Sequence, residues 1–330
     1  MKNIIKKIKN MFNLKLENVM QEIKLSIIIP CFNEEKTIPI FYKEIMKVIK
    51  QLDCNYELIF KNDGSTDETL NKIKNLSYIN QNVKYISFSR NFGKEAAMYA
   101  GFCNVHGEYI SIMDVDMQDP PSLLIDMIEL LNNDKYDCIA TRRKTRKGEP
   151  IIRSWFARKF YKIINKLTDI EIIDGARDFR LMKQEMVDCI ISMSENNRFS
   201  KGIFSWIGFN TYWISYDNKE RVAGETKWSF WKLMKYAIDG ITNFSQIPLT
   251  IIFFLSILFS CFSVFSIVYI LLSSNILIMK QLLIILGINI LELLAIGTIS
   301  QYISIINTEV KKRPHYIVKE SNIDMIKKIN

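Results

Sequence analysis

Histidine is scarce in this chain, and its cysteines lack any spacing typical of a metal site or a redox pair. The 330 residues include only two histidines, His106 and His315. Six cysteines are scattered along the sequence, with no CxxC pair. Such thiols are typical of a reduced, cytosolic domain rather than of a disulfide framework or a zinc site. With so little histidine, we do not expect a histidine-based catalytic machinery.

The chain also lacks charge over one long stretch. No charged residue occurs between Asp239 and Lys280, although 24% of all residues are charged. A soluble domain of this composition rarely leaves such a gap, so we expect a membrane region at 249–308 with two transmembrane helices, at about 249–272 and 281–307.

The second predicted span is interrupted only by Glu292. A carboxylate inside a span is unfavourable in lipid, so we expect Glu292 to face another helix, in a homo-oligomer, with Asn289 or Gln301 as its partners. Two alternatives are that this carboxyl is protonated, or that it sits near a thinned interface and is merely tolerated.

The N-terminus lacks the apolar run of a signal peptide. Residues 1–22 form a basic segment whose apolar side chains fall on one helical face, which fits either an interfacial amphipathic helix or a basic tail. The net charge of +9 suits a nucleic-acid binder or a protein that lies against anionic lipid. Because the lysines do not gather beside aromatic stacking residues, we expect membrane lipids and no nucleic acid as partners.

Basic residues flank the predicted spans unevenly. Lysines of an amphipathic juxtamembrane segment, 226–248, precede the first span, and Lys311, Lys312 and Arg313 follow the second, whereas the loop between the spans has one lysine. The positive-inside rule therefore predicts a multi-pass protein of the cell membrane, with the N-terminal domain and a basic tail, 309–330, in the cytoplasm.

Short apolar strands alternate with helical patterns between residues 23 and 225. The predicted strands share an apolar core: Leu25–Pro30, Tyr56–Lys61, Val83–Phe88, Glu108–Met113 and Tyr136–Thr141. This alternation predicts one α/β domain whose parallel-dominated sheet is covered on both faces. Ligands of such sheets bind at the carboxyl ends of the strands, where the polar clusters fall.

The clearest chemical signal follows the fourth predicted strand. Asp114 and Asp116 are separated by one residue, so in extended chain both side chains point the same way, and Gln118 follows. We expect exposed carboxylates at this strand end. They can grip a divalent cation, Mg²⁺ or Mn²⁺, together with a diphosphate. The alternative is a turn that uses Asp and Pro for local capping.

Two further polar clusters follow the first and second strands. Asp63 begins the run DGSTD, where its carboxylate can accept a hydrogen bond from a base or a ribose and Gly64 permits a close approach. Pro30 and Glu34 frame the run PCFNE. The alternative for the DGSTD run is a turn followed by a helix cap. Both runs lie on the edge of the sheet where a nucleotide would bind.

Ordered motifs from about Leu25 to Val318 resemble glycosyltransferase family 2. They read SIIIPCFNEE, NDGSTDET, SRNFGKEAA, MDVDMQDPP, GARDFRLM, RFSKGIFSWIGF, RVAGETKWS and EVKKRPHYIV. The nearest resemblance is to the polyprenyl-phosphate branch: the bactoprenol glucosyltransferases, with dolichol-phosphate mannose synthase as a relative. It implies a GT-A type nucleotide-diphospho-sugar transferase that inverts configuration, with a nucleotide-sugar donor and a polyprenyl phosphate acceptor.

The resemblance assigns roles by position. Pro30, Glu34, Asp63 and Asp114 match nucleotide-contacting residues, and Asp116 and Gln118 match the metal-side residues. The arginines that match the diphosphate and acceptor-phosphate sites are Arg142, Arg153 and Arg221. An acceptor phosphate monoester is already anionic near neutral pH, so arginines and a metal, rather than a strong base, would perform the electrostatic work.

Some positions depart from the family pattern. Asn62 replaces an Asp often found there, Ala157 stands where mannose synthases carry a Ser, and Glu292 and Gln301 differ from relatives in the second span. The default reaction is transfer of glucose from UDP-glucose to undecaprenyl phosphate for cell-envelope glycosylation. Mannose or another sugar is an alternative. A processive polysaccharide synthase is disfavoured because its Gln-x-x-Arg-Trp motif is absent, and a non-catalytic membrane-anchored sugar-nucleotide binder is disfavoured by the intact acidic pair.

Overall fold

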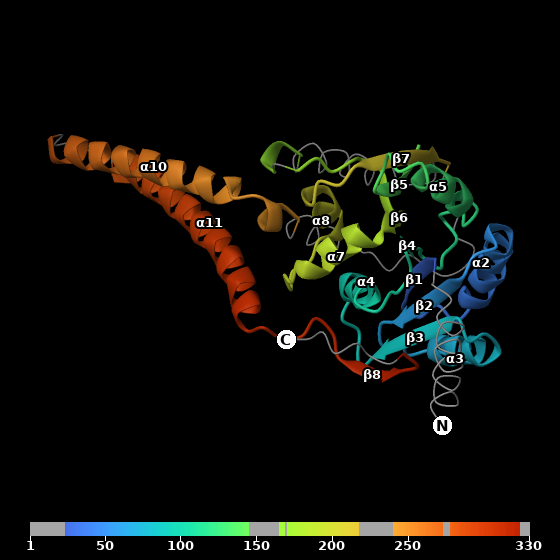
Figure 1. The fold of residues 1–330 in the computed structure, drawn as a ribbon. Helices are drawn as coiled ribbons and strands as arrows, with labels where there is room; N and C mark the ends of the chain where they lie inside the picture. Colours follow the sequence, from blue (N-terminus) through green and yellow to red (C-terminus); the bar gives the residue numbers. More distant parts are fainter. Residues whose placement is uncertain (1–23, 145–164, 169, 218–239, 273–277, 324–330) are drawn as a thin grey trace, which may run out of the picture.

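A mixed β-sheet forms the centre of the N-terminal domain (Figure 1). The computed structural model describes residues 24–144, 165–168, 170–217, 240–272 and 278–323. The strands are β1 Leu25–Cys31, β2 Tyr56–Asn62, β3 Val83–Phe88, β4 Tyr109–Ile112, β5 Cys138–Arg143, β6 Ala176–Lys183, β7 Thr211–Tyr216 and β8 Val318–Ser321. The helices are α2 Ile38–Leu52, α3 Thr69–Ile79, α4 Lys94–Phe102, α5 Leu123–Leu131, α7 Gln184–Ser192, α8 Ser200–Trp206, α10 Ile247–Leu272 and α11 Ile278–Val310.

The strand order is β7-β5-β6-β4-β1-β2-β3-β8. The first four strands pair in parallel, as the alternation of strands and helices predicts. β6 runs antiparallel to both β4 and β5, and β8 runs antiparallel to β3. The sheet is therefore dominated by parallel pairs, as expected, but β5 is not the neighbour of β4, because β6 inserts between them. Its reversed direction brings its first residues to the carboxyl edge of β4.

Two apolar layers explain why the sheet is buried on both faces. Side chains alternate along β1, so that Leu25, Ile27 and Ile29 pack toward α2 and α5, whereas Ile28 packs toward α4. All four side chains are fully buried. The domain thus has three layers, with α2, α3 and α5 on one face and α4, α7 and α8 on the other.

The position of β1 determines where a ligand can bind. From β1 the chain builds outward through β2 and β3 on one side, and then returns to place β4 on the other side. Such a reversal leaves a crevice beyond the carboxyl ends of the two central strands. The three predicted motif loops follow β1, β2 and β4, at this edge of the sheet.

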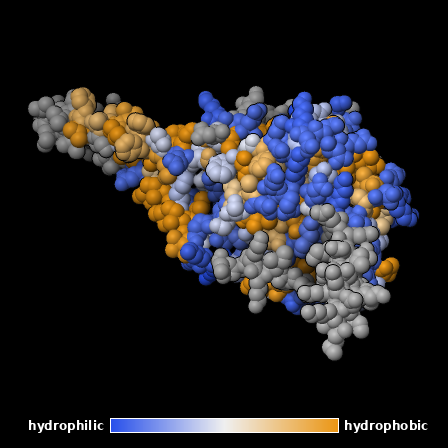
Figure 2. All heavy atoms as spheres, viewed as in Figure 1, coloured by the Kyte–Doolittle hydropathy of each residue, from blue (hydrophilic) through white to orange (hydrophobic). Residues whose placement is uncertain are grey.

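The helices α10 and α11 lie side by side and project from the domain (Figure 1). α10 begins two residues before the first predicted span and ends with it, and α11 extends three residues beyond the second predicted span at each end. Within the described residues, Gly287–Val310 is the helical stretch long and apolar enough to cross a membrane, and Ile247–Phe259 is a shorter apolar one. Figure 2 shows hydrophobic side chains over the length of α11 that faces the viewer, in contrast to the polar surface of the domain. Glu292 and Asn289 are exposed on α11.

The segment expected as a basic tail returns to the domain instead. After α11, the chain forms β8, which pairs with β3 through Ile86↔Ser321 and Ser87↔Glu320. Ser89 also donates its backbone N–H to the carbonyl of Ile317. A four-residue strand with two charged side chains carries little apolar signal, which is why the sequence pattern did not indicate it. The predicted N-terminal segment 1–22 and most of the juxtamembrane segment lie outside the described residues.

Candidate active site

The loops that follow β1 and β2 are joined by hydrogen bonds. Asn33 donates its backbone N–H to Ser65 Oγ at 2.9 Å, and Glu34 donates its own to Thr69 Oγ1 at 2.7 Å. The carboxylate of Glu34 accepts from Thr37 Oγ1 at 2.7 Å. Because each motif supports the other, the PCFNE and DGSTD runs form one rigid rim on the carboxyl edge.

Asp63 is buried, and its carboxylate is held by the chain itself. Oδ1 accepts from the backbone N–H of Phe92 at 2.6 Å, and Oδ2 accepts from that of Gly93 at 2.9 Å. Burial raises the pKa of Asp63 to about 6, although these hydrogen bonds and Arg90 oppose the shift. A Cβ on Gly64 would lie 2.3 Å from the backbone of Arg90. The close approach expected at Gly64 is therefore made by the loop before α4.

Asp114 lies just beyond β4 and pairs with a lysine. Lys94 Nζ, from the first residue of α4, lies 2.8 Å from Asp114 and 2.6 Å from Asp178 of β6. Burial alone would lower the pKa of Lys94, but the two carboxylates raise it above its usual range. Burial alone would raise the pKa of Asp178, but Lys94 and Lys201 hold it well below its usual range. Lys94 and Asp178 are therefore both ionised at neutral pH.

Asp116 does not share the environment of Asp114. β4 ends at Ile112, and the chain then turns, with Met117 in the left-handed region at φ 61°. The expected alternation of an extended chain therefore does not continue through this pair. Asp116 is buried rather than exposed, and its Oδ1 accepts the backbone N–H of Gln118 at 3.1 Å.

A buried cluster fixes the loop that carries Gln118. Arg177, at the start of β6, donates to Gln118 Oε1 at 3.2 Å and to Asp119 Oδ1 at 2.9 Å. The hydroxyl of Tyr216 donates to the same Asp119 oxygen. Burial and the neighbouring Asp119 raise the pKa of Tyr216, so this hydroxyl keeps its proton and acts as the donor. The metal-side loop is thereby pinned to β6 and β7.

The oxygen donors at this edge suit a hard divalent cation. Asp114 and Asp116 supply carboxylate oxygens and Gln118 an amide oxygen, the ligand types that Mg²⁺ and Mn²⁺ accept. Within the described residues, no three Asp, Glu, His or Cys side chains gather as a ready-made metal site.

The predicted basic and proline positions have different fates. Arg142 lies at the end of β5, on the same edge, and is exposed, with its Nε donating to Ser215 Oγ at 2.8 Å. Pro30 lies within β1, opposite Lys61 in the register. Arg153 and Arg221, together with Ala157, lie outside the described residues.

Three residues of the site were not assigned from the sequence. Lys94, Asp178 and Arg177 stand in the quoted runs SRNFGKEAA and GARDFRLM, but their partners are 20 to 84 residues away. Only the reversed direction of β6 brings Arg177 and Asp178 beside β4. The signal available from the sequence was their presence in these two motifs.

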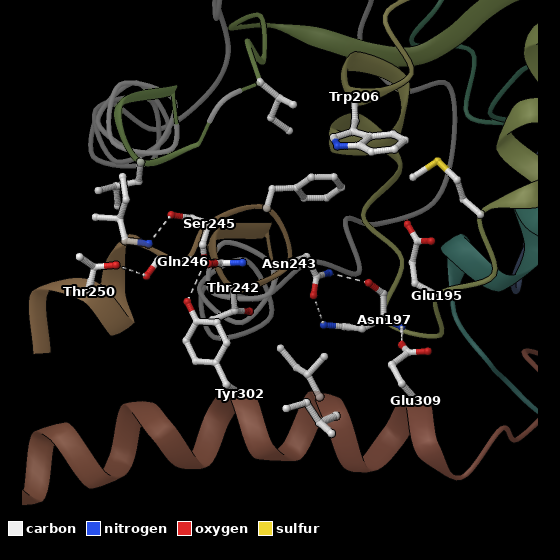
Figure 3. A pocket seen from close by; sticks show the side chains of 17 residues that line it. Glu195, Asn197, Trp206, Thr242, Asn243, Ser245, Gln246, Thr250, Tyr302 and Glu309 are labelled. Carbon is white, nitrogen blue, oxygen red and sulfur yellow. Dashed lines mark hydrogen bonds between the residues drawn. The ribbon is translucent and has the colours of Figure 1, made fainter. Parts of the chain in front are cut away.

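A cavity of about 780 Å³ lies where α10 and α11 meet the domain (Figure 3). One part of its wall is apolar and includes Trp206, Phe244 and Ile305, and the other is polar. The polar side chains labelled in Figure 3 include Tyr302, whose hydroxyl donates to the Ser245 carbonyl at 2.8 Å. No arginine or lysine is among the described residues that line it.

Comparison with known proteins identifies the family. The model of glycosyl transferase family 2 matches residues 26–191. The glycosyltransferase CsbB of Bacillus subtilis (strain 168) is 41% identical over 310 residues, which cover 92% of this chain and 94% of that protein. The bactoprenol glucosyl transferase of Shigella phage SfII is 37% identical over 306 residues, covering 91% and 98%.

Among solved structures, the mannosyltransferase PcManGT of Pyrobaculum calidifontis, in complex with GDP-Man and Mn²⁺, is similar with a TM-score of 0.45 and 14% identity. That likeness covers 66% of this chain and 62% of the other. The sheet described above, mixed and mainly parallel, is of the GT-A type. The chain belongs to glycosyl transferase family 2, and it is a glycosyltransferase.

Proposed function

We propose that this protein transfers a hexose from a nucleoside diphosphate donor to a polyprenyl phosphate, with inversion at the anomeric carbon. The observation that carries the proposal is the joining, in one chain, of an acidic carboxyl edge to two long apolar helices. Three relatives that each match at least 90% of the chain carry the words bactoprenol glucosyl transferase in their names. This supports a lipid phosphate acceptor. Glucose from UDP-glucose is the donor we infer from those names.

The helices support a membrane location. α10 has 26 residues, which is about 39 Å of helix, and α11 is longer. The Tyr302 hydroxyl of α11 binds Ser245, just before α10, and β8 follows α11 in the domain sheet. The first residues of α10 and the last residues of α11 therefore both lie beside the domain. If both helices span the bilayer, as we propose, the domain and the C-terminal strand lie on one side, and the basic flanks place that side in the cytoplasm.

The acceptor would use two different surfaces. Its phosphate needs cations, which we assign to Arg142, Arg153 and Arg221. Its isoprenoid chain needs an apolar seat, and the cavity beside α11 offers one. Glu195 and Glu309 line that cavity without a cation among its described residues. The cavity would therefore repel a phosphate and accept only the hydrocarbon.

A divalent cation, Mg²⁺ or Mn²⁺, is part of the proposal. Asp114, Asp116 and Gln118 would hold it, and when bound it would offset the charge on the leaving diphosphate. The nucleotide-sugar donor would be oriented by the rim formed by the PCFNE and DGSTD runs, which contain Glu34 and Asp63. Lys94 pairs with both Asp114 and Asp178 and so limits the repulsion between these two carboxylates.

The test is a donor panel with purified protein and undecaprenyl phosphate, with the lipid products read by mass spectrometry. We expect UDP-glucose to give a hexosyl lipid, and chelation of divalent cations to abolish it. Because Asp116 is buried, Asp116→Asn is the suitable variant, since it preserves shape while removing charge. We expect it to lose most activity without a change in Tm. Absence of a lipid product with every donor, or full turnover in excess chelator, would overturn the corresponding part of the proposal.

A further inference from the structure

The segment that follows the membrane helices touches the domain at several points around the candidate active site. We call residues 309–321 the return strap. At its start, the carboxylate of Glu309 accepts the backbone N–H of Asn196 at 2.7 Å and that of Asn197 at 3.2 Å. Figure 3 shows Glu309 rising from α11 toward Asn197. The end of α11 is therefore fastened to the loop that precedes α8.

Hydrogen bonds connect that loop to the helix that carries Lys94 of the Lys94–Asp114–Asp178 triad. Ser200, the first residue of α8, donates its backbone N–H and its hydroxyl to the carboxylate of Glu95. Glu95 follows Lys94, whose ammonium binds Asp114 and Asp178. A movement of the loop would thus be passed to the first turn of α4 through these hydrogen bonds.

Aromatic contacts brace the same route. Arg198 is buried, donates to the carbonyls of Met193 and Ile190, and lies over the ring of Tyr99 at 4.4 Å. The ring of His315, which belongs to the return strap, lies 4.5 Å from the same Tyr99 ring. Loop, α4 and strap therefore meet at one point.

The strap also reaches the nucleotide side of the edge. Tyr316 stacks on Phe88 with ring centroids 4.8 Å apart, and Phe88 contacts Phe92 edge-on at 5.9 Å. Phe92 donates the backbone N–H that holds Asp63. The return strap thus reaches Asp63 through Phe88 and Phe92, and it contacts α4, the helix that begins with Lys94, at Tyr99.

We infer that the return strap is a positioning element, and that Glu309 sets the geometry of the Lys94–Asp114–Asp178 triad according to the placement of the membrane helices. This inference rests on the proposed function. An acceptor phosphate presented at a bilayer surface must meet a reaction centre held at a fixed height, and misplacement of reacting groups by about 1 Å can cost about a hundredfold in rate. A carboxylate that accepts two backbone N–H groups fixes that height without blocking the cavity.

The experiment compares full-length Glu309→Ala and Glu309→Gln with a control on the same strap, Glu320→Gln. Glu320 pairs with Lys74 at 2.6 Å, on the sheet edge and away from the triad. We measure kcat for transfer to undecaprenyl phosphate, UDP affinity in Mn²⁺ by calorimetry, and Tm. Glu309→Ala should lower kcat about tenfold or more, whereas Glu320→Gln should leave both kcat and UDP affinity unchanged within about twofold. Glu309→Gln should be intermediate, because its amide oxygen still accepts.

A kcat within twofold of wild type in Glu309→Ala, or an equal loss in Glu320→Gln, would overturn the inference. Hydrogen–deuterium exchange provides a readout that does not need turnover. If Glu309→Ala fails to fold, the exchange of Glu309→Gln is compared with that of wild type instead. We expect faster exchange at 196–206 and 94–102 in the Glu309 variants alone. If wild type transfers no sugar, the proposed function fails, whereas unchanged exchange in these segments contradicts the strap even when transfer is observed.

Discussion

Replacement of Lys94 by methionine removes the cation between two carboxylates while preserving side-chain volume. The side chains of Lys94, Asp114 and Asp178 are only 31%, 26% and 20% exposed. Breaking a fully buried pair costs about 3–5 kcal/mol, and partial solvation of this triad reduces our expectation to about 2.5 kcal/mol. For a domain of this size that corresponds to a fall in Tm of roughly 5–10 °C at pH 7.

The loss should depend on pH with a defined sign. Lys94 holds the pKa of Asp178 below its usual range, so the pair stabilises the fold at pH values above the unfolded pKa of about 3.9. As the pH falls toward the lower folded pKa, wild type loses this contribution. The variant never had it. The difference in Tm should therefore be greatest at pH 6–8 and shrink by pH 3.

Thermal unfolding in detergent, followed by intrinsic fluorescence between pH 3 and pH 8, measures this difference. Lys183→Met is the matched control, because Lys183 pairs with an exposed Asp134 at 2.9 Å, and it should shift Tm by less than about 2 °C. The reasoning is refuted if Lys94→Met behaves like this control at pH 7, or if its effect persists unchanged at pH 3.

Three other residues give separate predictions. Burial lowers the pKa of Lys61 to about 7 and leaves its Nζ without a hydrogen-bond partner in the described part of the chain, so Lys61→Met should raise stability by at least about 1 kcal/mol at pH 7, with the gain shrinking toward pH 10 in Tm profiles. Asp63→Asn should lower Tm, and because the folded pKa of about 6 is raised, the gap to wild type should narrow from pH 4 to pH 7. Glu292→Leu should shift the oligomer distribution in detergent whereas Glu292→Gln should not; identical cross-linked species for wild type and Glu292→Leu would show that Glu292 is only tolerated.

The sequence predicted the first half of the fold because local rules decide it. The apolar runs of β1 to β4 and the helices between them obey strand and helix periodicity, and the order of the motifs indicated the edge at which they meet. Leu25–Cys31 and Val83–Phe88 were expected within one residue of their observed bounds. The acidic pair after β4 was located in the same way.

Long-range pairing decided the rest. The insertion of β6 between β4 and β5 depends on contacts that no local pattern records, and it is this insertion that brings Asp178 to Lys94 and Arg177 to Asp119. Asp116 is buried in a turn in which Met117 has a positive φ, and the sequence does not predict this conformation for a methionine. The return of the chain to β3 after α11 was missed for the same reason, since a strand of four residues gains its stability from the sheet it joins.

The pairing of β3 with β8 also imposes an order on biosynthesis. Ile86 and Ser321 are separated by the whole remainder of the domain and by both apolar helices, so the edge of β3 stays uncovered until the last part of the chain is made. Contacts at such separation close slowly, because the entropy of the long loop must be overcome first. If α10 and α11 insert into a membrane, as proposed above, their insertion would shorten that search by anchoring the C-terminal residues beside the domain. Completion of the sheet is thus a late folding event, and a chain arrested before it exposes a bare strand edge open to aggregation and proteolysis.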